Sequence, residues 1–211
     1  MPTARAAHVT RASGEGKVCA LTFDDGPNGI DTMTLLDFLA ALDVPAVFCV
    51  VGECIEAPAT DRGPRGADVL RRIVADGHVL ANHSTSFADM GDWSADRVRA
   101  DLERNNRIIR SVVGDVEIPY WRAPNGHWGV TAEVAAELGM APLGVINHIG
   151  DWETQDVPTL ESRLRNAMRP GELVLVHDGG GDRAGSVEAV RTIVTERLAQ
   201  GWRFTLPDRE P

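Results

Sequence analysis

The sequence predicts an α/β protein in which parallel strands curl into a closed or nearly closed barrel with helices on its outside. Two observations support this fold class. Short apolar runs alternate along the chain with segments whose apolar residues recur at helical spacing. Some runs, such as 46–51, contain no polar residue, which is typical of a strand buried on both faces of a parallel sheet.

The expected elements follow one another in a regular order. The first strand, 18–23, ends at an Asp-Asp-Gly-Pro turn, and the first helix, 31–42, carries leucines on one face with Asp31 as a plausible cap. A Pro- and Gly-rich surface loop is expected at 57–67. Further strands are expected at 46–51, 79–81, before Arg122, 142–146 and 172–176, and further helices at 68–75, 94–112, 131–138, 160–168 and 186–200, before a final segment at 202–206.

The length and composition indicate one globular domain. The chain has 211 residues, of which 43% are hydrophobic and 25% charged, so it can bury a core of its own. We assign residues 1–15 to an N-terminal extension and 16–211 to the domain. Its net charge of −10, without a cluster of Lys and Arg, argues against nucleic acid and membranes as partners, and we expect a monomer.

The cysteines and the N-terminus bear on the cellular compartment. Cys19, Cys49 and Cys54 do not form a Cys-x-x-Cys or zinc-finger spacing, and we interpret them as buried thiols in a reducing compartment. The basic N-terminal segment is not followed by an apolar stretch. The sequence as given is therefore expected to be cytoplasmic, or secreted if an export signal has been trimmed.

Polar side chains follow the expected strands, and in this fold class the carboxyl ends of the strands carry the chemistry. Because these ends meet at one edge of the sheet, we expect the side chains to point into one mouth. They are Asp24 and Asp25 after the first strand, His83 after the third, then Arg122, Asp151, and His177 with Asp178.

These residue types fit metal-assisted hydrolysis. Adjacent carboxylates repel each other, so Asp24 and Asp25 require a counter-charge, which a metal, Arg122 or both can supply. One carboxylate can then hold a divalent ion with an imidazole while the other acts as a base. His177 could protonate a leaving group if Asp151 raises its pKa.

Each feature also has an ordinary structural interpretation. Asp-Gly-Pro is often only a turn, and the Asn-His-Ser segment 82–84 could cap a helix. Arg122 and Asp151 could form a simple ion pair. Three further histidines are interpreted as loop residues without an identified interaction partner: His78, His127 and His148.

Five segments together resemble motifs of the NodB-homology polysaccharide deacetylases, also called carbohydrate esterase family four. The resemblance covers about 16–207 and implies an irregular (β/α) barrel with its active site at the carboxyl ends of the strands. The matching segments are Thr-Phe-Asp-Asp-Gly-Pro-Asn at 22–28, Asn-His-Ser at 82–84, Arg-Ala-Pro-Asn-Gly-His-Trp at 122–128, Asp-Trp at 151–152 and Leu-Val-His-Asp at 175–178.

The resemblance implies an acetyl-removing hydrolase with a divalent metal, and it implies a role for each matching residue. The substrate would be acetylated xylan or an oligomer or polymer containing N-acetylglucosamine; ester and amide substrates both stay open. The implied roles are base for Asp24, metal ligands for Asp25 and His83, orientation of the base for Arg122, general acid for His177 tuned by Asp151, oxyanion contact for Asn125, groove wall for Trp128 and acetyl pocket for Leu175.

The sequence departs from the family pattern at two positions. The second motif usually closes with a histidine, where this chain has Phe87, so water or Asp89 would complete the metal site; for Asp89 we favour a cap of the following helix over a direct ligand. We expect weaker metal binding, with a preference for cobalt, manganese or magnesium over tetrahedral zinc. Asn125 replaces a common aromatic residue, but its backbone N–H can still serve an oxyanion.

Two further functions stay open from the sequence. Phe87 motivates a degenerate, non-catalytic carbohydrate-binding protein, although such a protein would have no use for the other site residues. The second alternative is a small-molecule amidohydrolase of the same fold. Exposed indoles near the loops would stack on sugar rings; the alternative is that at least half of these tryptophans are core residues: Trp93, Trp121, Trp128 and Trp152.

Overall fold

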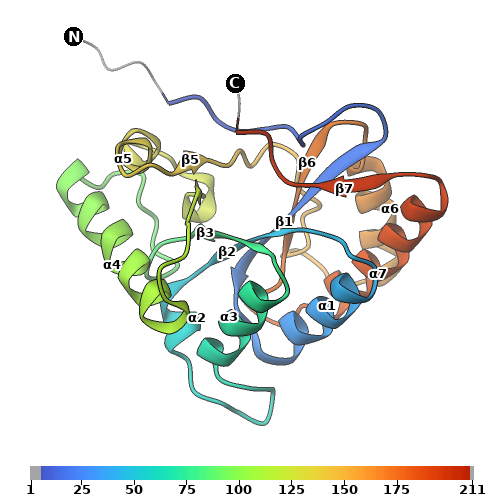
Figure 1. Cartoon of the computed structure of the whole chain (residues 1–211), viewed down its shortest axis with the longest axis horizontal. Coiled ribbons are helices and arrows are strands. Elements are labelled where there is room, and N and C mark those ends of the chain that lie inside the picture. The colour runs from blue at the N-terminus through green and yellow to red at the C-terminus, as the bar shows by residue number, and fades with distance from the viewer. Residues whose placement is uncertain (1–5, 210–211) are drawn as a thin grey trace.

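The computed structural model describes residues 6–209, and its centre is a curled parallel sheet (Figure 1). The strands lie in the order β5-β4-β3-β2-β1-β6, and β7 pairs with β1 beyond this path. All these pairings are parallel. The strands are β1 (Val18–Gly26), β2 (Val47–Val50), β3 (Val79–Asn82), β4 (Tyr120–Trp121), β5 (Ala141–Pro142), β6 (Glu172–His177) and β7 (Arg203–Thr205).

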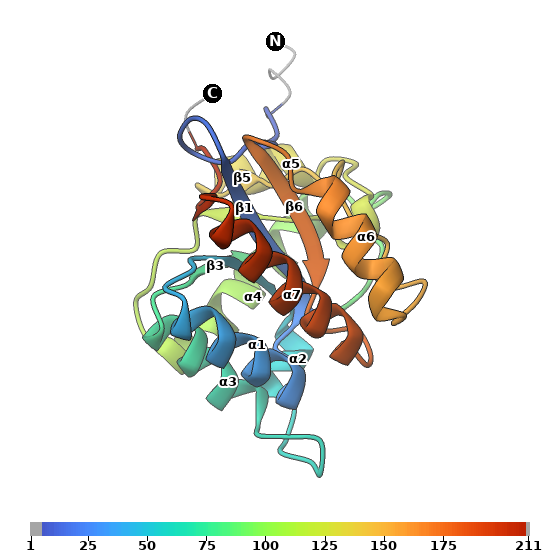
Figure 2. The ribbon, with the colours of Figure 1, turned by 90° about the vertical axis from the view of Figure 1, so that its right-hand side faces the viewer.

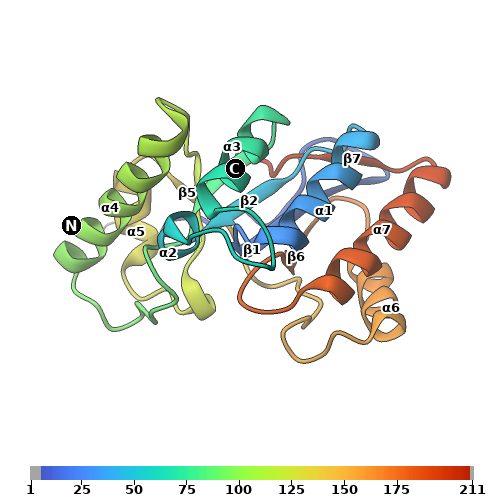
Figure 3. The same cartoon turned by 90° about the horizontal axis from the view of Figure 1, so that it is seen from below.

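Helices surround the outside of the sheet. Seen from below, α4, α2, α3, α1, α7 and α6 follow one another along an arc (Figure 3). The helix α7 crosses β1 and β6 and lies beside α6 (Figure 2). The bounds are α1 (Gly29–Ala41), α2 (Gly52–Glu56), α3 (Gly66–Ala75), α4 (Ala95–Val113), α5 (Thr131–Glu137), α6 (Val157–Ala167) and α7 (Ala184–Ala199), with a 3-10 turn η1 at Pro124–Gly126.

Single bridges complete the barrel between β5 and β6. The backbone N–H of Leu175 in β6 donates to the carbonyl of Asn147 at 2.9 Å, and His148 bridges to Leu175. On the other side of this gap, residues 9–11 form bridges to Leu143 and to Glu172. The barrel is therefore irregular, and the predicted fold class is confirmed.

The two buried faces of β1 explain why five of its first six residues are apolar. Cys19, Leu21 and Phe23 pack in the cluster that includes the inner faces of the helices. Val18 and Ala20 belong to a second cluster, with apolar residues of β2, β3 and β6. Both faces of the strand are buried, so apolar residues are favoured at every position.

The structure corrects the expected elements at four points. The strand expected at 142–146 stops at Pro142, because the next segment leaves the sheet and the N–H of Gly144 donates to the carbonyl of Val9 at 2.8 Å. The helix expected from 68 begins at Gly66, inside the expected loop, and α2 was not predicted. Asp31 lies within α1, where its carboxylate accepts the N–H of Arg183 at 3.0 Å, and the N-cap position belongs to Asn28.

All three cysteines are free thiols. Cys19 and Cys49 are buried as predicted, whereas Cys54 is partly exposed, with its Sγ 3.4 Å from the carbonyl oxygen of Asp25. Burial raises the pKa of Cys19 and of Cys54 to about 12. Within 6–209, no helix is both long enough and apolar enough to cross a membrane.

Segments near the two ends of the described chain meet close to the starting ends of β1 and β6 (Figure 1). Ala12 bridges to Pro207, and the N–H of Asp208 donates to the carbonyl of Arg11 at 2.9 Å. Arg11 in turn bridges to Glu172, the first residue of β6. Residues 11–12 and 207–208 therefore lie on the side of the barrel away from the carboxyl ends of β1 and β6.

Candidate active site

A cavity of about 620 Å³ opens at the carboxyl ends of the strands. Its lining comes from the loops after β1, β3, β4, β5 and β6, as the fold class predicts. The predicted site residues that line it are Asp24, Asp25, His83, Asn125, Leu175 and His177.

A buried ion pair fixes the first aspartate of the mouth. Arg122 is fully buried, and its Nη1 donates to Asp24 Oδ1 at 2.7 Å and to Thr22 Oγ1 at 2.7 Å. Its Nη2 donates to the carbonyl of Gly144 at 3.2 Å. Burial alone would lower the pKa of Arg122, but the Asp24 carboxylate outweighs it and raises that pKa. Asp24 is thus held in one orientation as a charged acceptor.

Asp25 and His83 face each other beside this pair. The backbone of Asp25 has a φ of 72°, a left-handed conformation that is costly for a non-glycine residue and is typically kept at functional sites. Its Oδ1 lies 3.3 Å from His83 Nε2, whereas Asp24 Oδ2 lies 3.9 Å from the same nitrogen. Burial would raise the pKa of Asp25, but His83 outweighs it, so the pKa is lowered and the carboxylate stays charged.

The donor atoms of this pair suit a divalent metal. His83 Nδ1 lies 2.7 Å from the carbonyl oxygen of Arg122, which can only accept, so this nitrogen carries the hydrogen and Nε2 faces the carboxylates. In the neutral ring Nε2 then has a free lone pair. Within the described part of the chain, no group of three or more His, Cys, Asp and Glu side chains is placed to hold a metal. The fit is therefore to a site with two protein ligands.

Phe87 and Asp89 occupy different positions relative to this site. Phe87 lines the cavity and is 43% exposed. Asp89 is not among the cavity-lining residues, because its carboxylate accepts the N–H of Gly91 at 2.9 Å and pairs with His127 Nδ1 at 2.5 Å. The expectation that Asp89 caps α4 is wrong, since Ser94 accepts the N–H of Arg97 there. The expectation that His127 has no partner is also wrong.

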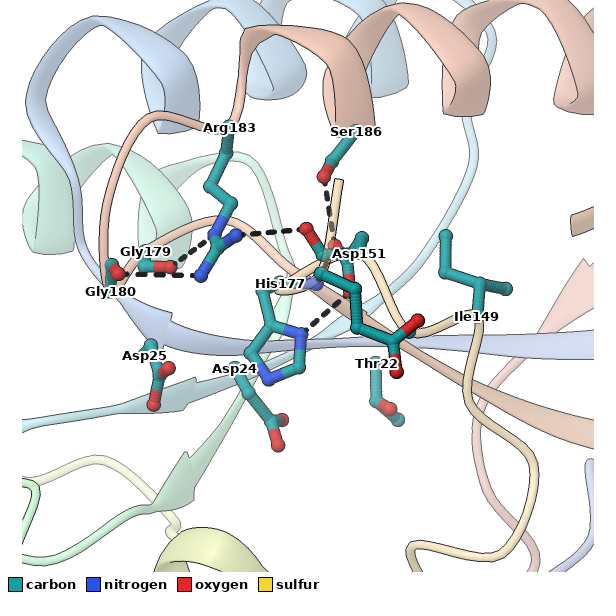
Figure 4. A network of polar contacts seen from close by, with 12 residues as sticks. Thr22, Asp24, Asp25, Ile149, Asp151, His177, Gly179, Gly180, Arg183 and Ser186 are labelled. Atoms are coloured by element: carbon teal, nitrogen blue, oxygen red, sulfur yellow. Dashed lines mark hydrogen bonds and ion pairs between the residues drawn. The ribbon is translucent and has the colours of Figure 1, made fainter. Parts of the chain in front are cut away.

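His177 and Asp151 form a second charged pair at the end of β6 (Figure 4). Asp151 is fully buried, and its carboxylate contacts His177 Nδ1 at 2.8 Å, the His177 N–H at 2.9 Å and Ser186 Oγ at 2.8 Å. Burial alone would lower the pKa of His177, but Asp151 and the carboxylates of the mouth outweigh it and raise that pKa. His177 also pairs in register with Asp24 across β1 and β6. The imidazole of His177 and the carboxylate of Asp24 therefore lie at the ends of neighbouring strands.

The sequence analysis missed Arg183, which lines the cavity and is itself buried. Its guanidinium donates to the carbonyls of Gly179 at 2.6 Å, Gly180 at 3.3 Å and Asp151 at 3.0 Å (Figure 4). It thereby joins the loop after β6 to the loop that carries Asp151. The available signal was an arginine two residues after a run of three glycines near a strand end.

Asp178 does not point into the mouth with the other predicted residues. Its side chain is fully buried and accepts a hydrogen bond from Thr32 Oγ1 at 2.6 Å. Burial raises the pKa of this carboxyl group to about 7. A Cβ atom on Gly26 would lie 2.3 Å from its Oδ2, so the carboxyl group fills the space directly against the turn after Asp25.

The remaining predicted residues differ in their access to the cavity. Asn125 lies on its rim with a φ of 58°. Trp152 lines it, is 50% exposed and stands edge-on to His177 with ring centroids 5.3 Å apart. Trp121 is fully buried, and Trp128 is not among the lining residues, since its ring packs 4.2 Å from that of His8. Trp93 is also outside the lining and lies under the guanidinium of Arg97.

Comparisons with known proteins agree with this arrangement. A family model described as "Polysaccharide deacetylase" matches residues 11–143. A chitooligosaccharide deacetylase of Sinorhizobium fredii is 34% identical over 160 residues, covering 75% of this chain and 71% of the relative.

Two solved structures extend the similarity to nearly the whole chain. A peptidoglycan N-acetylglucosamine deacetylase superposes with a TM-score of 0.83 at 26% identity, covering 95% of this chain and 91% of the other. A family 4 acetyl xylan esterase from Clostridium thermocellum, in complex with a cobalt ion, superposes with a TM-score of 0.77 at 29% identity, covering 90% and 88%.

Proposed function

The chain belongs to the polysaccharide deacetylase family, and on this premise we propose that it hydrolyses acetyl groups of oligosaccharides containing N-acetylglucosamine. The family acts on acetyl groups of carbohydrates and is generally metal-dependent. One observation carries the proposal. Asp24, hydrogen-bonded to Arg122, and His177, hydrogen-bonded to Asp151, line the same cavity as Asp25 and His83.

Asp24 is the proposed base. Its Oδ1 is fixed by Arg122, while Oδ2 is the carboxylate oxygen nearer to His83 and the cavity. A carboxylate held in this way can take a proton from a water molecule as that water attacks the acetyl carbon. Arg122 acts on the reaction by orienting this carboxylate.

His177 is the proposed acid on the leaving group. Asp151 holds Nδ1, so the proton to be delivered is the one on Nε2, on the ring edge away from Asp151 (Figure 4). An amine leaves an acyl carbon far more readily when it is protonated, and the raised pKa of His177 keeps this proton available near neutral pH. The backbone N–H of Asn125 is the proposed donor to the oxyanion.

Asp25 and His83 would hold the divalent metal. When bound, the ion supplies Lewis acidity toward the acetyl carbonyl. With two protein ligands and Phe87 on the same cavity, we propose weaker binding than at a three-ligand site and a preference for cobalt, manganese or magnesium over tetrahedral zinc.

The proposal of an amide substrate is supported by the relatives' names. Four rhizobial relatives at 30 to 35% identity are named chitooligosaccharide deacetylase. An acetyl ester of xylan is the second candidate, because the cobalt-containing structure is that of an acetyl xylan esterase. The oxyanion and base chemistry is the same for both, so the substrates must be compared directly.

The test is acetate release from N-acetylglucosamine oligomers and from acetylated xylan, after chelator treatment and addition of cobalt, zinc, manganese or magnesium in turn. We expect release only with metal, and loss of release in Asp24→Asn protein. Asp89→Asn is the matched control, since Asp89 lies outside the cavity lining and pairs with His127. An active Asp24→Asn protein would refute the assigned base, and metal-independent activity would favour the small-molecule amidohydrolase.

A further inference from the structure

Arg183 is a buried cation at the edge of the cavity, and the proposed base, acid and metal ligands do not include it. It directly precedes α7, is 6% exposed and lines the cavity. In the part of the chain that the structure describes, its guanidinium donates to backbone carbonyls and not to a carboxylate. Burying a cation without a paired carboxylate costs free energy, so stability alone does not favour an arginine here.

We propose that Arg183 is a positioning residue that holds the acid of the reaction and the metal-binding carboxylate in fixed relative positions. It does so by joining the loop that carries Asp151 to the turn that packs against Asp25. This inference rests on the proposed function, because it assigns to Arg183 an effect on the same reaction.

One nitrogen of the guanidinium supports the acid. Nη1 of Arg183 donates to the carbonyl of Asp151 at 3.0 Å, and the carboxylate of Asp151 contacts His177 Nδ1 at 2.8 Å (Figure 4). The same carbonyl also accepts from Gln155 Nε2 at 2.7 Å, but Gln155 follows in the same segment of the chain. Arg183 therefore ties the backbone of Asp151 to a different loop, the one after β6.

The other two nitrogens support the turn beside Asp25. Nε donates to the carbonyl of Gly179 at 2.6 Å and Nη2 to that of Gly180 at 3.3 Å. The N–H of Gly179 in turn donates to the carbonyl of Asp24 at 3.2 Å. A Cβ atom on Gly179 would lie 2.0 Å from the Asp25 carbonyl oxygen, and one on Gly180 would lie 2.5 Å from Asp25 Oδ2. The turn thus packs against both the backbone and the carboxylate of Asp25.

Asp25 requires such support because its backbone is strained. Its φ of 72° is costly for a non-glycine residue and persists only where the surrounding structure fixes it. Contacts that hold the turn also keep the carboxylate of Asp25 directed at His83 Nε2, 3.3 Å away. A misplacement of about 1 Å in a reacting group can lower a rate about 100-fold, so this support bears on catalysis.

The three contacts require an arginine. They use three different nitrogens of one planar group. A lysine keeps the positive charge but has a single nitrogen, which cannot occupy three positions. Arg183→Lys therefore removes the positioning while keeping the charge, whereas Arg183→Met removes both.

The test compares wild-type protein with Arg183→Lys and Arg183→Met. The readouts are kcat and KM for N-acetylglucosamine oligomers with cobalt, the Kd of cobalt measured by calorimetry, and the pKa of the His177 ring measured by NMR in metal-free protein. Arg191→Lys and Arg191→Met are the matched controls, because Arg191 lies on α7 and pairs with Glu188 on an exposed face. Urea unfolding establishes that each variant is folded under the assay conditions.

We expect both Arg183 variants to lose kcat by about tenfold to 100-fold with little change in KM, and to bind cobalt about tenfold more weakly. Burial lowers the pKa of His177 and Asp151 raises it, so a loosened Asp151 should let this pKa fall in both variants. A pKa that rises in Arg183→Met and stays unchanged in Arg183→Lys would show an effect of charge alone and overturn the proposal. So would a change confined to KM, or no change in any readout.

Two further results separate this proposal from folding and from the proposed function. In wild-type protein, the Nε–H of Arg183 should exchange with solvent much more slowly than that of Arg191; equal exchange would overturn the proposal even if neither Arg183 variant folds. If wild-type protein releases no acetate with any metal, the proposed function fails. A lower His177 pKa and weaker cobalt binding in both variants would then still support the positioning role.

Discussion

Replacing Arg122 with methionine should destabilise the protein strongly, because it leaves a buried carboxylate without its counter-charge. The substitution removes the hydrogen bonds to Asp24, to Thr22 and to the carbonyl of Gly144. Asp24 is only 3% exposed, so water cannot replace the lost donors without rearrangement. Methionine is an unbranched side chain that can fill much of the space, so charge and hydrogen bonding dominate the loss.

The expected loss in free energy of unfolding is about 3–5 kcal/mol, the cost of removing one partner of a buried ion pair. That is a large part of the stability of a typical domain, which is about 5–15 kcal/mol. The variant Asp24→Asn/Arg122→Met removes the stranded charge as well. We therefore expect the double variant to be more stable than Arg122→Met alone.

Urea denaturation followed by circular dichroism, with a chelator present, measures these free energies without a contribution from bound metal. The control is Arg191→Met, since Arg191 pairs with Glu188 at 3.6 Å on an exposed face, and its expected loss is below about 1 kcal/mol. A loss below about 1 kcal/mol for Arg122→Met would refute the reasoning. So would a double variant less stable than Arg122→Met alone.

Three further outcomes follow from the site. Asp151→Asn removes the main group that raises the pKa of His177, and because the acid must be protonated, the alkaline limb of the kcat profile should move to lower pH; an unmoved limb would contradict the acid role. Phe87→His adds a donor to the cavity of Asp25, so calorimetry should show cobalt binding about tenfold or more tighter, and an unchanged affinity would place residue 87 outside the metal's reach. Gly179→Ala should destabilise by about 1–3 kcal/mol in thermal or urea unfolding, because its Cβ would lie 2.0 Å from the carbonyl oxygen of Asp25; a stable variant would show that this turn can shift.

The buried strands and the strand-end residues could be predicted from the sequence because their signals are local. An apolar run such as that of β1 is required wherever both faces of a strand are covered. Placing Asp24 and His177 together required only that both follow a strand of one parallel sheet. The order of elements was therefore enough to bring the main site residues into one cavity.

The remaining features depend on contacts between distant segments. The strand expected at 142–146 ends at Pro142, where the backbone of Val9 hydrogen-bonds to Pro142 and Gly144, and composition does not reveal a contact with so distant a segment. Asp89 was expected at a helix end, yet it lies against His127, 38 positions away. Arg183 donates to backbone carbonyls. Because every residue has a backbone carbonyl, the sequence does not indicate which of them an arginine will contact.

The meeting of residues 11–12 with 207–208 also bears on where the protein can be labelled. These residues lie near the starting ends of β1 and β6, whereas the cavity of the site lies at the carboxyl ends of the strands. A fluorescent label placed at residue 208 would therefore sit on the side of the barrel away from the cavity, clear of any long sugar chain that enters it.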